Sequence, residues 1–68
     1  MEKIYKLIEQ VNGELSRKKR SIHITDNGRG SWFLYWVDFD GEVNASKENV
    51  KGEDLYKAIE DLYNYLRD

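Results

Sequence analysis

The stretch Ser31-Trp-Phe-Leu-Tyr-Trp-Val-Asp-Phe39 decides the fold of this 68-residue chain. It holds both tryptophans, both phenylalanines and one of the five tyrosines. Aromatic and β-branched residues favour strands, and glycines bound the stretch, Gly28 and Gly30 before it and Gly41 after it. We therefore expect this stretch to be the central strand of a sheet, paired on both edges.

Length and composition limit what holds the chain together. A chain of 68 residues forms a single domain, residues 1–68, and buries roughly 60% of its unfolded surface. It has no cysteine and one histidine, so no disulfide or cysteine-based zinc site can stabilise it. The packing of a few large apolar side chains must carry the fold.

Hydropathy and charge bear on location and partners. The longest apolar run is too short to span a bilayer, and the opening Met-Glu-Lys-Ile-Tyr lacks a signal-peptide pattern, so we expect a cytoplasmic protein that does not bind membranes. The net charge is -2, but residues 1–30 carry seven Lys and Arg against four Asp and Glu, and residues 31–68 carry four against nine. The molecule should therefore have a basic end and an acidic end.

Two segments have helical periodicity. The first has an apolar stripe of Ile4, Leu7, Ile8, Val11 and Leu15. Gly13 costs about 1 kcal/mol relative to alanine, which leaves the end of this helix open. The second helix opens at Gly52-Glu-Asp54, where carboxylates suit the positive amino end. Its stripe comprises Leu55, Ile59, Leu62 and Leu66, with Tyr56 and Tyr63 beside it.

A strand before the central one is predicted by the alternation of Ser21–Thr25. Two loops can join the two strands. With the two-residue turn Asn27-Gly28, the isoleucines of the first strand face the side of Tyr35. With the three-residue loop Gly28–Gly30, in which the last glycine is left-handed, they face the side of Trp36.

The predicted turn after the central strand is compatible with only one of these two loops. Asp40-Gly41 is a strong signal for a two-residue hairpin, which would set Ala45 opposite Trp36 and bring Val43 to the same face. Only the three-residue first loop agrees with that placement, because a slip of one residue exchanges the two faces of a strand. The predicted core face comprises Ile22, Ile24, Trp32, Leu34, Trp36, Val43 and Ala45.

The element order is αβββα. The sequence therefore predicts an α+β fold, a two-layer domain in which two helices pack on one face of a three-stranded antiparallel meander. Both outer strands would leave an unpaired edge, and the third strand would be short and polar, as protected edges often are.

The opposite sheet face should be open. It should display an apolar ridge of Phe33, Tyr35, Val37 and Phe39 with a polar rim of His23, Thr25, Glu42, Asn44 and Ser46. Such a ridge is typical of an interaction surface. We therefore predict a non-enzymatic protein-binding module whose candidate partner-binding residues are Phe33, Tyr35, Val37, Phe39 and His23. The partner would be another protein or a second copy of the chain.

Catalytic and metal-binding motifs are weak. His23 and Ser46 could supply a base and a hydroxyl, but no nucleophile turn surrounds the serine and no carboxylate is placed to orient the histidine. Asp38–Asn49 begins like a calcium loop, but its glycine stands at the fourth place instead of the sixth and the twelfth residue is Asn instead of Glu. We predict no enzymatic activity, metal, cofactor or small-molecule substrate.

Nucleic acid is the alternative partner. The cluster Arg17, Lys18, Lys19 and Arg20, together with Arg29, could contact phosphates while sheet aromatics stack on bases. The acidity of the whole chain and of its second helix favours a protein partner instead.

The length and element order resemble those of the double-stranded RNA-binding domain over the whole chain. That family has a Gly-Pro-x-His loop between its first two strands and a lysine cluster at the start of its last helix. Here these places read Asp26-Asn-Gly-Arg-Gly30 and Lys51-Gly-Glu-Asp54, so the resemblance implies an architecture without the RNA contacts. The order is also similar to that of some small phage-encoded inhibitors of host defence nucleases. A phage or mobile-element accessory protein would suit the compactness and the charge separation.

Overall fold

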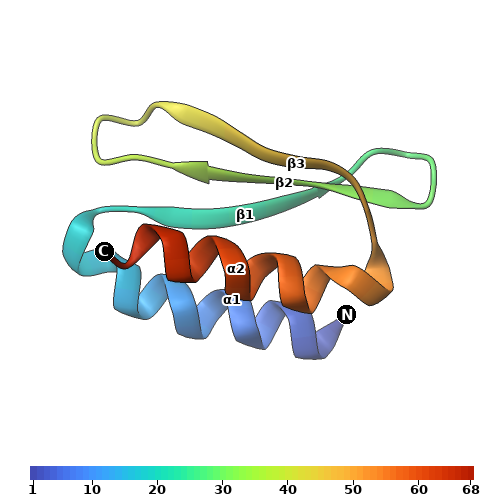
Figure 1. Cartoon of the computed structure of the whole chain (residues 1–68), viewed down its shortest axis with the longest axis horizontal. Coiled ribbons are helices and arrows are strands. Elements are labelled where there is room, and N and C mark those ends of the chain that lie inside the picture. The colour runs from blue at the N-terminus through green and yellow to red at the C-terminus, as the bar shows by residue number, and fades with distance from the viewer.

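The computed structural model describes residues 1–68 and has the order helix, three strands, helix (Figure 1). The elements are α1 (Glu2–Leu15), β1 (Ser21–Asp26), β2 (Ser31–Val37), β3 (Val43–Lys51) and α2 (Leu55–Leu66), with the 3₁₀ turns η1 (Ser16–Lys18) and η2 (Gly52–Asp54). The sheet is antiparallel with β2 in the centre. The predicted α+β fold is confirmed. Neither helix has the length and apolarity needed to cross a membrane.

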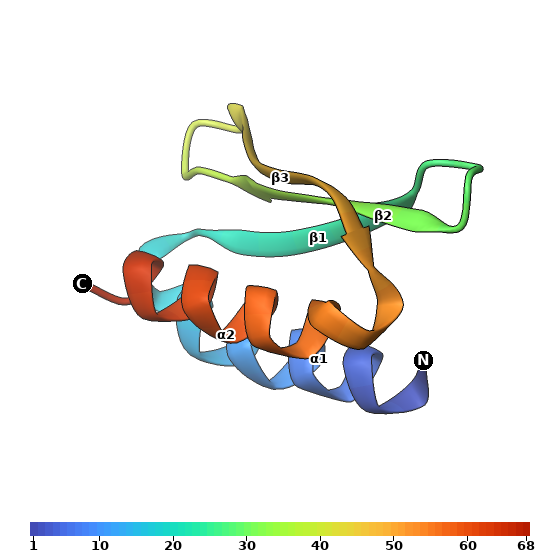
Figure 2. The same ribbon diagram turned by 45° about the vertical axis from the view of Figure 1, so that its right-hand side comes forward.

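The two helices lie side by side against one face of the sheet, and no element covers the other face (Figures 1 and 2). Between the layers lie twelve buried side chains, all hydrophobic: Ile4, Leu7, Val11, Leu15, Ile22, Leu34, Val50, Leu55, Ala58, Ile59, Leu62 and Leu66. Both predicted helical stripes are therefore confirmed. The first helix continues through Gly13 because Leu15, only 2% exposed, is anchored in the core.

The pairing of β1 with β2 is the one that the three-residue loop predicts. Ile24 lies opposite Leu34. The backbone N–H of Asn27 donates to the carbonyl of Ser31 at 3.0 Å and closes the loop Gly28–Gly30. Its two glycines have φ angles of 77° and 80°, which residues with a Cβ rarely adopt.

The hairpin between β2 and β3 differs from the prediction. The N–H of Asp38 donates to the carbonyl of Glu42 at 3.0 Å, and the N–H of Gly41 donates to the carbonyl of Asp38 at 2.9 Å. The loop between these paired residues therefore has three residues, not two, with Gly41 left-handed at φ 83° in its last place. The side chain of Asp40 accepts a hydrogen bond from the Glu42 N–H at 2.9 Å, which stabilises the longer loop.

This change of one residue moves two side chains to the other face of the sheet. Ala45 lies opposite Tyr35, and Val43 lies opposite Val37. Both are exposed on the open face, so the prediction that they belong to the core was wrong. Asn44, predicted for the rim of the open face, lies opposite Trp36 instead.

Strand β3 is also longer than predicted, nine residues, and it reaches the core only near its end. Its pairing with β2 is irregular between Trp32 and Tyr35, where β3 carries extra residues. One residue of that stretch, Asn49, has a φ of 54°. Because each extra residue changes which side chains face the helices, Val50 comes to lie opposite Trp32, buried at 7% exposure. The segment expected to be a polar connector is therefore part of the strand.

Candidate protein-interaction face

The open face of the sheet carries a row of three stacked rings. The ring centroids of His23 and Tyr35 are 5.3 Å apart with an interplanar angle of 18°, and those of Phe33 and Tyr35 are 5.6 Å apart at 25°. His23 lies directly opposite Tyr35 in the register, and Phe33 is two residues away on the same face of β2. The three rings are half-buried. Three of the predicted partner-binding residues therefore form one group.

Apolar side chains extend this row toward the second hairpin. Val37 continues along β2, and β3 adds Val43, which is 62% exposed, and Ala45. We call the surface formed by His23, Phe33, Tyr35, Val37, Val43 and Ala45 the aromatic face. The last two residues were missed by the sequence reasoning. A signal was available, since a glycine in the last place of a three-residue loop marks both hairpins.

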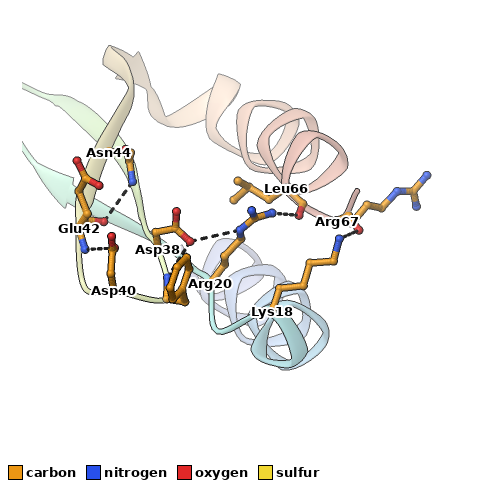
Figure 3. A network of polar contacts seen from close by, with 9 residues as sticks. Lys18, Arg20, Asp38, Asp40, Glu42, Asn44, Leu66 and Arg67 are labelled. Carbon is orange, nitrogen blue, oxygen red and sulfur yellow. Dashed lines mark hydrogen bonds and ion pairs between the residues drawn. The ribbon is translucent and has the colours of Figure 1, made fainter.

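Phe39 lies on the second hairpin loop and not on β2, and the residue is 70% exposed. Polar contacts hold the loop in place (Figure 3). Asp38 Oδ1 accepts the N–H of Phe39 at 2.7 Å and lies 3.6 Å from Nε of Arg20. The side chain of Phe39 therefore lies at the end of the aromatic face, on a loop that the contacts of Asp38 connect to the rest of the domain.

The cluster Arg17–Arg20 was predicted to contact nucleic acid, but two of its four side chains form hydrogen bonds with the end of α2 (Figure 3). Lys18 Nζ donates to the carbonyl of Arg67 at 2.6 Å, and Arg20 Nη1 donates to the carbonyl of Leu66 at 2.8 Å. The last carbonyls of a helix have no partner within it and carry partial negative charge. These cations therefore join the carboxyl ends of the two helices.

The remaining candidate nucleic-acid residues are separated in space. Arg17 and Lys19 are exposed near the carboxyl end of α1. Arg29 lies in the hairpin between β1 and β2, at the opposite end of the sheet (Figure 1). The five cations predicted from the sequence do not form one patch.

The hydrogen bond of His23 is formed within its own strand. Ser21 Oγ lies 2.7 Å from His23 Nε2, and which atom donates depends on the tautomer. Ser46, the hydroxyl considered in the sequence, lies on β3 in the irregular stretch. A hydrolytic triad needs a hydroxyl, an imidazole and a carboxylate that orients the imidazole. Here the hydroxyl and the imidazole are present, but no carboxylate forms a hydrogen bond with the ring. The contact fixes the orientation of the imidazole in the stacked row.

A second apolar surface lies between α2 and β3. It is a shallow groove of about 440 Å³ whose apolar lining includes Trp36, Leu62 and Tyr65. Tyr65 is 73% exposed, and the guanidinium of Arg20 lies 5.8 Å from the centroid of the Trp36 ring. Ala45 of the aromatic face also lines this groove, so the two surfaces meet at β3.

No protein-family model matches the chain, and neither does any curated protein or solved structure.

Proposed function

We propose that this protein is a non-enzymatic protein-binding module that holds its partner on the aromatic face. The observation that carries the proposal is the stacked row of His23, Tyr35 and Phe33 on a sheet face that no other element covers. Apolar groups packed side by side on an uncovered face lose unfavourable contact with water when a partner covers them.

The rings are held in position before binding. Each projects from a paired strand, and stacking restricts its rotation, so few side-chain rotamers are lost when a partner docks. Tyrosine and phenylalanine with this support are typical of the residues that contribute most to binding at protein interfaces. The aromatic face is therefore suited to act as the centre of an interface.

The surroundings of the row suit a partner that binds and dissociates. Thr25 is exposed beside it, and Ser21 and His23 provide polar atoms at its β1 side. A polar border around an apolar centre keeps such a face soluble when it is free. An accessory protein of a phage or mobile element, which acts by binding a protein of its host, would use a face of this kind.

The test replaces aromatic side chains of the proposed binding surface by substitutions that leave the buried core unchanged. The double variant Tyr35→Ser with Phe39→Ser takes one ring from the row and the exposed ring from the hairpin, and it leaves the core intact. Tyr65→Ser is the matched control, because it removes an exposed ring from α2. All three proteins are immobilised and used to capture partners from a lysate of the source cells.

We expect the same protein to be recovered with the wild type and the Tyr65→Ser variant and to be lost with the double variant. Circular dichroism checks that all three remain folded. Equal recovery by the wild type and the folded double variant would remove the aromatic face as the binding surface.

A further inference from the structure

We propose that a pocket between the carboxyl ends of the two helices binds a small phosphate monoester. The pocket has a volume of about 380 Å³, which is within the range of small-molecule sites. It uses no residue of the aromatic face, so the inference goes beyond the proposed function. Its lining includes Gly13, Glu14, Arg17, Lys18, Tyr63 and Arg67.

Cations outnumber carboxylates in this lining. There are three cations, Arg17, Lys18 and Arg67, and one carboxylate, that of Glu14. None of these four charged groups forms an ion pair within the chain. The pocket therefore has a formal surplus of two positive charges. A phosphate monoester carries about the opposite charge near neutral pH, close to -2.

The helix carbonyls beside the pocket are already hydrogen-bonded, which lowers the obstacle that a helix carboxyl end presents to an anion. Lys18 Nζ donates to the carbonyl of Arg67 at 2.6 Å (Figure 3), and Ser16 Oγ donates to the carbonyl of Gly13 at 2.7 Å. The guanidinium groups of Arg17 and Arg67 have no carboxylate partner. Each can offer two parallel N–H donors to a phosphate.

Tyr63 gives the pocket an aromatic wall. The residue is half-buried, and the guanidinium carbon of Arg67 lies 5.8 Å from the centroid of its ring. This contact restricts the side chain of Arg67, so fewer rotamers are lost when a phosphate binds. An apolar group attached to the phosphate can pack against the tyrosine ring. The lining therefore favours an organic monoester over inorganic phosphate.

Gly13 supports the site independently of the charges. It lies inside α1 without a positive φ, and a Cβ there would meet no atom within 4 Å. Alanine would therefore fit and would favour the helix. Neither backbone conformation nor packing requires glycine here, whereas a side chain would take up space at the wall of the pocket. Stability is commonly lower than it could be at positions that function requires.

The experiment titrates the protein with phenyl phosphate and with inorganic phosphate at constant ionic strength and follows the amide chemical shifts. We expect saturable shifts at Gly13 and Tyr63, with phenyl phosphate bound about fivefold more tightly because its ring packs on the tyrosine. Arg17→Met and Arg67→Met should each raise the dissociation constant about tenfold, since each removes a charged pair of donors. Lys19→Met removes a cation outside the lining and is the matched control, with a change below about twofold.

Two further variants separate ligand binding from fold stability. Gly13→Ala should raise the melting temperature by roughly 4–8 °C and yet raise the dissociation constant about fivefold, because its methyl group narrows the pocket. Glu14→Gln should lower the dissociation constant about threefold, because it removes the carboxylate from the lining. The double variant Tyr35→Ser, Phe39→Ser should bind phenyl phosphate as the wild type does. The capture experiment and this titration can therefore fail separately.

Five results would overturn the inference. Shifts that stay linear with both phosphates would exclude a site, and equal affinity for the two would exclude the organic group. A loss from Lys19→Met as large as that from Arg17→Met would mean a general attraction of charge. A stabilised Gly13→Ala variant with unchanged affinity would mean that the ligand does not need that space. Tighter binding of a short oligonucleotide at the same residues would assign the pocket to nucleic acid.

Discussion

The side-chain amide of Asn12 forms two hydrogen bonds with the backbone of Ile22: Nδ2 donates to the carbonyl at 2.9 Å, and Oδ1 accepts the N–H at 2.7 Å. A residue in α1 thus takes the place that a further strand would occupy beside β1. The edge of β1, expected to be unpaired, is therefore partly closed. The edge of β3 is protected differently, by its irregular pairing.

Replacing Asn12 by Ala should destabilise the domain by about 1–3 kcal/mol, because the partly buried N–H and carbonyl of Ile22 lose their partners. In a domain of this size that lowers the melting temperature by roughly 4–8 °C per kcal/mol. Asn64→Ala is the control for the helix propensity of alanine, since Asn64 is exposed on α2. Equal effects of the two changes in thermal unfolding would mean that the edge contact contributes nothing.

Arg20→Met should cost about 1–2 kcal/mol, because the carbonyl of Leu66 loses a charged donor and Asp38 loses its cation. Methionine keeps an apolar stem over the Trp36 ring, so the packing there is largely retained. The exposed Arg17→Met change is the control and should have little effect.

Hydrogen exchange adds a second measurement on the Arg20→Met variant. The amide of Phe39, bound to Asp38, should exchange faster than in the wild type, while the amides of α1 remain protected. Unchanged exchange in the second hairpin would show that Arg20 does not hold that loop.

The two faces of the sheet should respond differently to truncation. Leu34→Ala should cost about 2–5 kcal/mol, because Leu34 is 1% exposed and its removal leaves a cavity. Val43→Ala should cost less than about 0.5 kcal/mol, because Val43 is 62% exposed. Urea unfolding of both variants makes the comparison. A large loss of stability for Val43→Ala would mean that Val43 faces the core, as the two-residue hairpin predicted from the sequence requires.

Nucleic-acid binding should be weak, and the titration curve should not reach saturation. Lys18 and Arg20 are bound to carbonyls of α2, and Arg29 is at the far end of the sheet. The measurement is a titration of labelled single-stranded and duplex oligonucleotides at two salt concentrations. Tight binding at low salt that falls steeply with salt, and that is lost when Arg17–Arg20 are replaced by Ala, would instead establish nucleic acid as the partner.

The sequence by itself determined the elements with strong local patterns. The apolar stripes from Ile4 to Leu15 and from Leu55 to Leu66 repeat at the helical period, and both helices formed where those stripes lie. The first hairpin was also predicted correctly, although the argument for it used the wrong second hairpin. Its pairing holds because it directs Ile22, 0% exposed, toward the helices.

The candidate site was predicted in part. His23, Phe33, Tyr35 and Val37 were assigned to the open face from the alternation of β1 and β2, and they lie there. Val43 and Ala45 were assigned to the wrong face, because two loop lengths that differ by one residue are compatible with Asp40-Gly41 and reverse every side chain that follows.

Only the tertiary structure decided how β3 and the cations are used. Lys18 and Arg20 contact carbonyls that are 49 and 46 residues away, and no local pattern indicates such partners. The irregular pairing of β3 sets Val50 opposite Trp32, where its side chain is buried in the core. A regular strand would not place this valine there. Periodicity is a property of neighbouring residues, whereas register and helix-end contacts depend on packing between segments that are distant in the chain.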